Sequence, residues 1–237
     1  MSVGVGRLAV ILPVLNEAAH IRECLVVLQP WRAQGHMIIL VDGGSQDGTV
    51  ELASPWVDRV VHSAPGRAVQ MNAGAAVTQA TGLIFLHADT RLPEAAPALV
   101  VSALRQSPWG RFDVRLSGDS FMYRLIATGI NLRSRWSGVA TGDQALFMRR
   151  DLFLQCGGFA PIPLMEDVEL TSRLRRYKRP VCVKVPAVTD SRRWQKHGTW
   201  RTITFMWRLR WAFWRGADPA VLAKRYYPSH VIHPTDD

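Results

Sequence analysis

Cysteine is scarce in this sequence, and its arrangement excludes two classes of protein. The 237 residues contain three cysteines, Cys24, Cys156 and Cys182, and no Cys-x-x-Cys pair. Disulfide-stapled secreted domains need an even, dense set of cysteines, and cysteine zinc sites need closely spaced pairs. Neither class is indicated, so we expect the protein to work in the reducing cytoplasm.

Long hydrophobic runs are also missing. No apolar run reaches the roughly 18 residues that a membrane-spanning helix needs. The short run near the N-terminus leads directly into Asn16 and Glu17 without a clear cleavage site, unlike a signal peptide. We therefore expect a first strand there and no spanning segment.

Acidic residues are the minority among the charges, 19 against 29 Lys and Arg, for a formal net charge of +10. Such a balance suits nucleotides, phosphorylated acceptors, acidic lipid or nucleic acid. No nucleic-acid recognition motif accompanies the basic residues, so nucleic acid is not an expected partner. A Walker A sequence is absent, and the glycines at Gly4 and Gly6 precede a strand instead of following one, which fails the dinucleotide fingerprint.

Short apolar runs alternate with helical patterns in the first half of the chain. Strands are expected at residues 8–14, 37–41, 60–61 and 83–86, and helices at 21–28, 49–53 and 68–80. This alternation is typical of a doubly wound, mostly parallel α/β sheet, whose ligands bind beyond the carboxyl ends of the strands. After about residue 108 we expect a strand at 145–148, a Gly157-Gly158 turn and a helix that opens with the acids of MEDVEL.

Polar residues follow three of these strands. They are Asn16 and Glu17 after the first, DGGSQDGT (residues 42–49) after the second, and His87 and Asp89 after the fourth. Each group has a local alternative, because glycines and Asp47 suit a plain strand-to-helix turn, and Asp89 suits a turn cap. Arg67, in PGRAVQMNAGA, suits either a phosphate or a surface ion pair.

Seven segments in this order resemble glycosyltransferase family 2, which has the GT-A fold: ILPVLNE, VDGGSQDGT, PGRAVQMNAGA, LHADT, GDQALFMRRDLF, GGF and MEDVEL. The resemblance covers about residues 7–195. PGRAVQMN, HADT and SRRW also resemble a bacterial subgroup found beside radical-SAM and selenoprotein-associated genes and named for arsenosugar biosynthesis. The resemblance implies one domain, with a nucleotide-sugar-binding half at 7–107, an acceptor and catalytic half at 108–195 and an amphipathic helical tail at 196–237.

The same resemblance implies a donor site at the strand ends. The family's D-x-D motif corresponds to His87-Ala88-Asp89, so Asp89 would bind the Mg²⁺ or Mn²⁺ that holds the donor diphosphate. His87 replaces an acid, and three roles stay open for it: binding ribose, ligating the ion or shaping the pocket. The implied nucleotide-sugar site comprises Pro13, Leu15, Asn16, Glu17, Asp42, Gly43, Gly44, Ser45, Asp47, Arg67, Asn72, His87, Ala88 and Asp89.

The acceptor hydroxyl must lose a proton as it attacks, which calls for a carboxylate. By resemblance Asp167 is this base and Glu166 orients the acceptor, although acids also suit a helix N-terminus. The implied acceptor residues are Asp143, Gln144, Arg193 and Trp194; Asp190 stands where processive members carry glutamine, which argues against processivity.

These features predict a metal-dependent inverting glycosyltransferase. A sugar-nucleotide nucleotidyltransferase is one alternative, but it would carry a basic, glycine-rich loop after its first strand, and LPVLNE has neither property. A basic nucleic-acid-binding module is the other.

An aromatic stripe marks the C-terminal segment. Large apolar residues recur there at helical spacing, and they are Trp200, Ile203, Trp207, Trp211 and Trp214, beside arginines at 201, 208 and 215. We expect this stripe to be buried against protein, with a second subunit as the favoured partner in a homodimer. The alternative is an interfacial helix on anionic lipid at the inner membrane face.

Overall fold

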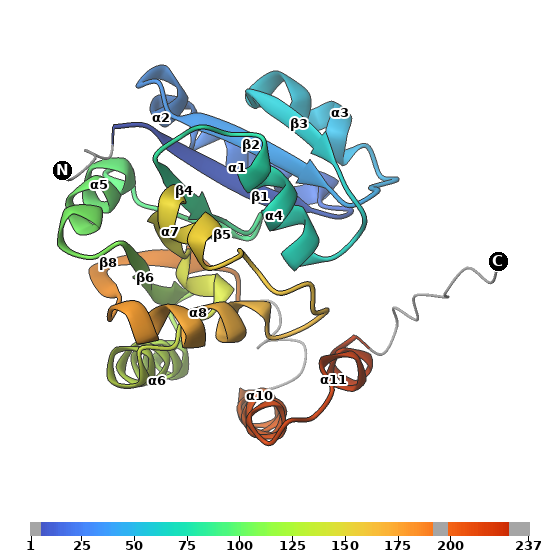
Figure 1. Cartoon of the computed structure of the whole chain (residues 1–237). Coiled ribbons are helices and arrows are strands. Elements are labelled where there is room, and N and C mark those ends of the chain that lie inside the picture. The colour runs from blue at the N-terminus through green and yellow to red at the C-terminus, as the bar shows by residue number, and fades with distance from the viewer. Residues whose placement is uncertain (1–5, 192–198, 228–237) are drawn as a thin grey trace.

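The computed structural model describes residues 6–191 and 199–227. Its centre is one mixed sheet of eight strands (Figure 1). The strands are β1 (Leu8–Val14), β2 (Met37–Asp42), β3 (Arg59–His62), β4 (Gly82–Phe85), β5 (Thr90–Arg91), β6 (Trp109–Leu116), β7 (Phe147–Arg149) and β8 (Val181–Thr189). They lie in the order β3-β2-β1-β4-β7-β6-β8-β5. The predicted α/β class is confirmed.

The two halves of the sheet differ in strand direction. β3, β2, β1 and β4 are parallel neighbours, and every residue of β1 is buried, as expected for a strand covered on both faces. β7 runs antiparallel between β4 and β6, and β5 runs antiparallel to β8, while β6 and β8 are parallel. The expectation of a mostly parallel sheet therefore holds for the first half, whereas the whole sheet is mixed.

Helices cover both faces of the sheet. They are α1 (Ala18–Val26), α2 (Gln29–Ala33), α3 (Thr49–Ala53), α4 (Arg67–Ala76), α5 (Ala96–Gln106), α6 (Phe121–Ser137), α7 (Arg150–Gln155), α8 (Glu166–Tyr177), α10 (Thr199–Trp214) and α11 (Pro219–Tyr226), with short 3-10 turns η1 (Ser54–Trp56) and η2 (Gly142–Gln144). The predicted helix at 49–53 has the same bounds as α3. The helix predicted to reach residue 80 ends at Ala76, and the Thr78 hydroxyl then accepts the Ala80 N–H.

The strands carry a core on each face, because successive side chains alternate. Leu8 and Leu12 of β1 belong to one cluster, and Ile11 to the other. On the second face α4 lies very close to the sheet: a Cβ on Gly74 would be 2.5 Å from Cγ2 of Ile11. This glycine lets α4 approach β1, which brings the N-terminal end of α4 toward the carboxyl ends of the strands.

The C-terminal helices pack on the rest of the domain through a third cluster. Its buried members include Met165 and Val168 near the start of α8, Leu209 of α10 and Leu222 of α11. The predicted tryptophan stripe is not the packing face, since Trp207, Trp211 and Trp214 are 69%, 61% and 63% exposed. The prediction that these rings are buried within the chain is therefore wrong. The predicted contact with a second subunit stays a prediction. Among the described helices, none combines the length and the apolar character that a membrane crossing requires.

Candidate active site

The loops after β1 and β2 are joined by hydrogen bonds at the carboxyl edge of the sheet. Asp42, 3% exposed, accepts the backbone N–H groups of Gly44 at 3.0 Å and Ser45 at 3.1 Å. The Asn16 N–H donates to the Ser45 hydroxyl, and the Asn16 amide oxygen accepts the N–H of Gln46, each at 2.9 Å. Desolvation opposes the charge of Asp42, but the bonds from Ser45 and Gly44 outweigh it and lower the pKa of that carboxyl.

Asp47 ties the same loops to the helices that follow them. Its carboxylate accepts the N–H of Ala18 at 2.9 Å and that of Thr49 at 3.1 Å, while the Glu17 N–H donates to the Thr49 hydroxyl at 2.8 Å. The local alternative for Asp47 thus has direct geometric support. Gly44 has a φ of 99°, which favours glycine, and Pro13 sits in β1 beside Val41.

Two amides of α4 are committed to backbone groups. Gln70 is buried, and its Nε2 donates to the carbonyls of Val14 at 2.8 Å and Val41 at 2.9 Å. Asn72 binds both backbone groups of Phe159, donating from Nδ2 at 2.8 Å and accepting at Oδ1 at 2.9 Å. Asn72 therefore positions the loop around Phe159, with one N–H and one lone pair of its amide outside this pairing.

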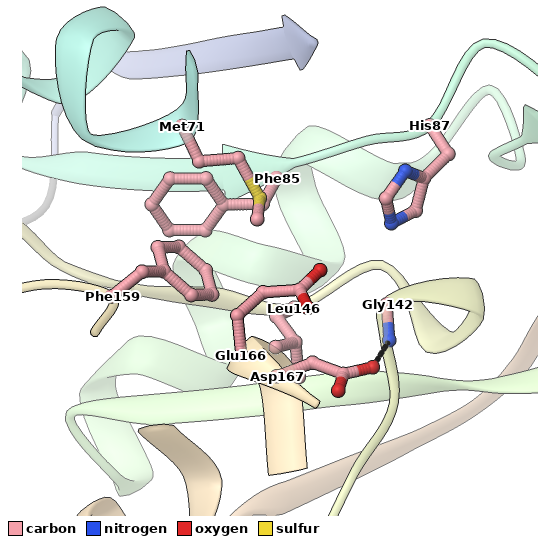
Figure 2. A pocket seen from close by; sticks show the side chains of 8 residues that line it. All are labelled: Met71, Phe85, His87, Gly142, Leu146, Phe159, Glu166 and Asp167. Atoms are coloured by element: carbon pink, nitrogen blue, oxygen red, sulfur yellow. Dashed lines mark hydrogen bonds between the residues drawn. The ribbon is translucent and has the colours of Figure 1, made fainter. Parts of the chain in front are cut away.

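His87, Gly142 and Asp167 meet at the centre of the site, as Figure 2 shows. The Gly142 N–H donates to Oδ2 of Asp167 at 2.7 Å, and the Val168 N–H donates to Oδ1 at 2.7 Å. A Cβ on Gly142 would lie 2.3 Å from Nε2 of His87. The lack of a side chain at 142 thus allows the histidine from the end of β4 to lie beside the acids from the start of α8.

Burial and mutual repulsion set the ionisation of the acids. Glu166 is 6% exposed, and desolvation, with the neighbouring charge of Asp167, raises its pKa to about 7. Desolvation and the charge of Asp89 likewise raise the pKa of Asp143. Carboxylates from three separate segments, after β4, in η2 and at the start of α8, therefore lie within electrostatic reach of one another.

Arg67 and His87 respond to that negative field in opposite ways. Desolvation opposes the charge of Arg67, but Tyr227 and the surrounding acids outweigh it and raise its pKa. Desolvation and the charge of Arg67 lower the pKa of His87 to about 4, against the pull of Asp89 and Asp167. At neutral pH the site thus holds a neutral imidazole beside a permanently charged guanidinium.

Side chains fill the inner part of the site almost completely, whereas charged residues at its edge reach solvent. A cavity of about 10 Å³, room for about one water molecule, is lined by Met71, Phe85, His87, Gly142, Leu146, Phe159, Glu166 and Asp167 (Figure 2). Arg67, Asp89 and Asp143 keep solvent-accessible surface, although neighbouring groups desolvate the charges of Arg67 and Asp143. Charged groups that reach solvent above an apolar floor are suited to a polar ligand that enters from outside.

Asp89 is the described residue best suited to a divalent ion. Its side chain is exposed, and only Oδ1 accepts a hydrogen bond within the described ranges, from the Thr90 hydroxyl at 3.1 Å. No group of three His, Cys, Asp or Glu residues in those ranges has the arrangement of a metal site. A single carboxylate fits a Mg²⁺-type ion whose other ligands are substrate phosphates and water, rather than a cage of protein ligands.

Several predicted acceptor residues are placed elsewhere or lie outside the described residues. Gln144 is fully buried, and its Oε1 accepts the Thr141 N–H at 3.2 Å, so it serves the η2 turn. Arg193 and Trp194 lie outside the described residues. The segment that leads to them starts beside the site, because the Asp190 N–H donates to the Asp89 carbonyl at 3.1 Å.

Three residues near the site were missed by the sequence analysis. Arg133 of α6 and Arg210 of α10 both lie within electrostatic reach of Asp167 and Asp143, and Tyr227 lies near Arg67. The predicted tail therefore contributes to the site instead of standing apart from it. No local motif marks these positions, since only the tertiary packing of α6, α10 and α11 brings them in.

A sequence model of glycosyl transferase family 2 matches residues 9–163. The chain is also similar to glycosyltransferases of Mycobacterium bovis and Mycobacterium tuberculosis named for PGL/p-HBAD biosynthesis, at 29% identity over 171 residues. That match covers 64% of this chain and 62% of each relative, so the chain spans less than two thirds of their length.

Solved structures resemble the fold. A mannosyltransferase from Pyrobaculum calidifontis, in complex with GDP-Man and Mn²⁺, matches 86% of this chain and 60% of its own at a TM-score of 0.64 and 20% identity. Glucosyl-3-phosphoglycerate synthase from Mycobacterium tuberculosis, in complex with Mn²⁺, UDP and glucosyl-3-phosphoglycerate, matches 77% of this chain and 71% of its own at a TM-score of 0.56 and 20% identity. The predicted GT-A fold is confirmed.

Proposed function

Because the chain belongs to glycosyl transferase family 2, we propose that it transfers a sugar from a nucleotide-sugar donor to an acceptor hydroxyl, with inversion and with Mg²⁺ or Mn²⁺. The observation that carries the proposal is the convergence of Arg67, Asp89, Asp143, Glu166 and Asp167 around His87 at the carboxyl edge of the sheet. Two matched structures with GDP-Man or UDP also contain Mn²⁺, which supports the choice of donor class and ion.

The loops after β1 and β2 are proposed to hold the nucleoside. Asp42 and Ser45 are rigidly placed by bonds to backbone, and Leu15 is 43% exposed beside them. Arg67, at the first residue of α4, adds a guanidinium for the diphosphate, which such a fork binds in bidentate fashion. A divalent ion held by Asp89 would supply Lewis-acid stabilisation of the departing diphosphate.

Asp167 is proposed to take the proton of the acceptor hydroxyl. Each of its oxygens accepts one backbone N–H, which fixes the carboxylate while leaving lone pairs for a substrate. As the acceptor oxygen bonds to the anomeric carbon, the bond from that carbon to the diphosphate oxygen breaks and the proton passes to Asp167. Glu166, held near a pKa of about 7, is suited to orient the acceptor by a hydrogen bond.

Finer assignments rest on the sequence motifs. PGRAVQMN and HADT support membership of the radical-SAM-associated subgroup, and the donor and acceptor halves at 7–107 and 108–195 are proposed on the same ground. The tail at 196–237 is proposed to belong to the site in part, through Arg210 and Tyr227. The low cysteine content supports a cytoplasmic location, and nucleic acid is not a proposed partner.

The test is a screen of nucleotide-sugar hydrolysis with Mn²⁺, followed by calorimetry of the matching nucleoside diphosphate. We expect binding that a chelator weakens by about tenfold or more, roughly 1.4 kcal/mol. Asp89→Ala should show the weakened affinity with or without Mn²⁺. The matched control is Asp58→Ala, which removes an acid that pairs with Arg32 away from the site. Equal nucleotide affinity in the chelated protein, the Asp89 variant and the untreated protein would exclude the metal assignment.

A further inference from the structure

Two arginines near the proposed catalytic acids have buried nitrogen atoms without hydrogen-bond partners. The Nε and Nη2 atoms of Arg133 and the Nε atom of Arg210 are buried, and none has a partner within the described ranges. Buried charged donors without partners are costly. Their neighbour Arg111 also has a buried Nε without a partner, but its charge is balanced because it pairs with Asp113 and donates to the Asn131 carbonyl.

The two guanidiniums lie close enough to repel each other. Desolvation, followed by the charge of Arg210, lowers the pKa of Arg133 to about 9, while Asp167 and Asp143 oppose the fall. Desolvation also lowers the pKa of Arg210, against the same two acids. Arg67 shares Asp143 with them but also feels Glu166 and Asp89. The arginine pair is thus associated with the proposed base and not with the proposed metal ligand.

We propose that Arg133 and Arg210 bind an anionic group on the acceptor, a phosphate or a carboxylate, and so position the acceptor hydroxyl against Asp167. This inference rests on the proposed function. Two planar guanidinium forks can satisfy an oxyanion in bidentate fashion, and a bound anion relieves their mutual repulsion. Arg133 comes from α6 and Arg210 from α10, so the proposed anion site is complete only when the C-terminal helix α10 is packed in place.

The experiment measures binding of inorganic phosphate to the full chain by calorimetry, with acetate as a separate carboxylate probe. We expect Arg133→Met and Arg210→Met each to weaken phosphate binding at least tenfold, because methionine keeps much of the length without the charge. Arg210→Lys should be intermediate. The matched control is Arg208→Met, which changes an exposed arginine on the same helix and should leave phosphate affinity unchanged.

Thermal unfolding separates binding from folding. Phosphate should raise the Tm of the wild type and of the Arg208 variant, but not that of Arg133→Met or Arg210→Met, since only bound anion stabilises the folded state. Folded variants that keep wild-type phosphate affinity would overturn the proposal, as would phosphate binding that Mn²⁺ and nucleoside diphosphate fully displace in the wild type. If the protein binds phosphate through this pair but binds no nucleotide, the proposed function fails while the proposed anion site stands. Preference for acetate over phosphate would identify the group as a carboxylate.

A second, independent observation concerns exposed apolar side chains on two helices. On α6, Phe121, Leu125, Leu132 and Trp136 share one side and are 75%, 53%, 61% and 83% exposed. The exposed tryptophans of α10, at 207, 211 and 214, also share one side. Both helices lie along the lower edge of the molecule in Figure 1. These seven side chains are here called the aromatic face, and exposed apolar groups gathered on one side of a helix are typical of interaction surfaces.

The charges around the aromatic face select its partner. Arg201 and Arg208 of α10, Arg215 directly after it and Arg124 of α6 are exposed, and the Arg215 guanidinium lies 5.1 Å from the Trp211 ring centre. Tryptophan and arginine side chains suit the boundary between headgroups and acyl chains. A second copy would bring an equally basic face against this one in a chain of net charge +10, whereas an anionic bilayer would neutralise it.

We infer that the aromatic face docks on an anionic membrane surface. The test is flotation of the full chain with vesicles of phosphatidylglycerol and phosphatidylcholine against pure phosphatidylcholine. We expect binding only to the anionic vesicles, weakened by added salt. Trp207→Glu/Trp211→Glu should abolish it, while the matched control Val26→Glu/Leu52→Glu, at two residues each 45% exposed on α1 and α3, should not.

Two outcomes would overturn the membrane inference. The first is failure of the wild type to float with anionic vesicles, or equal flotation of the folded tryptophan variant. The second is a stable dimer in light scattering that the tryptophan double substitution dissociates, because the aromatic face would then be covered by a second copy.

Discussion

The loops after β1 and β2 and the cluster around Asp167 use polar residues in opposite ways. In the loops, Asn16, Asp42 and Asp47 are bonded to backbone N–H groups. In the cluster, Arg133 and Arg210 keep buried donor atoms without partners in the described chain. The first arrangement is satisfied before any ligand arrives, whereas the second is not.

The difference separates two tasks. Polar side chains that are hydrogen-bonded to backbone groups hold a loop in one shape. Such a loop recognises a ligand through the shape of the loop and through the loop atoms that remain exposed. Desolvated, like-charged groups lower stability and are relieved when a complementary charge binds. We therefore expect substitutions in the loops to act mainly on folding, and substitutions in the cluster to act mainly on chemistry and binding.

The largest effect is expected for Asp167→Asn. An amide keeps the volume but cannot accept the acceptor proton, so transfer should fall by roughly 10² to 10⁴ while donor affinity stays near the wild-type value. Initial-rate assays and nucleotide calorimetry measure the two quantities.

The control for this change is Glu169→Gln, which removes a carboxylate from the same helix that pairs with Arg173 away from the site. It should transfer at close to the wild-type rate. A folded Asp167 variant with near-normal transfer would exclude this residue as the base and would weaken the contrast between the two regions.

The next effect concerns pH and Glu166. Desolvation and Asp167 raise its folded pKa to about 7 from the ordinary value of 4.5, while Arg67 opposes the shift and Asp143 adds to it. An acid with a raised pKa binds its proton more tightly when folded, so its contribution is fully present below pH 4.5 and is lost as pH rises through about 7. The loss is on the order of 3 kcal/mol.

Denaturant unfolding of the wild type and Glu166→Gln at several pH values measures this contribution. The glutamine does not ionise, so the variant should gain stability relative to the wild type between pH 4.5 and about 7. A stability difference that does not change over this window would mean that Glu166 ionises freely in the folded protein.

The smallest effect is expected at Asn72, a predicted donor residue whose amide instead binds both backbone groups of Phe159. Asn72→Ala leaves those groups unpaired and should cost about 2 kcal/mol of unfolding free energy. Donor affinity of the folded variant should change little.

Asn131→Ala is the matched comparison, because Asn131 binds the N–H and carbonyl of Val114 in the same way. The two variants should lose similar stability. If Asn72→Ala loses much nucleotide affinity without losing stability, Asn72 belongs to the donor site as the sequence predicted.

Much of the first half of the fold was predictable, because buried parallel strands read as continuous apolar runs. β1 has the predicted bounds, and β2 and β4 differ by a residue at their ends. The strands β5, β6 and β8 and the helices α5 and α6 were not predicted. An edge strand as short as β5 carries little pattern, and α6 exposes Leu125 and Trp136 where a helix with a single apolar face would be polar.

The site was predictable where a motif carries both chemistry and position. Asp89, Glu166 and Asp167 each follow a local signal, a strand end or a helix start, so their neighbourhood could be expected. The roles of Asn72 and Gln144 could not be predicted, because an amide side chain can donate and accept hydrogen bonds to many partners. Only the fold decides that Asn72 binds Phe159 and that Gln144 binds Thr141.

The sequence by itself determined the α/β alternation, the edge of the sheet that carries chemistry and the family to which the chain belongs, because these depend on local apolar periodicity and on motifs in order. Only the tertiary structure decided that Arg133, Arg210 and Tyr227 join the site and that the tryptophans of α10 face outward. The reason is that α10 has two apolar sides. Periodicity predicted the tryptophan side, but the fit of Leu209 against Met165 and Val168 buries the other side.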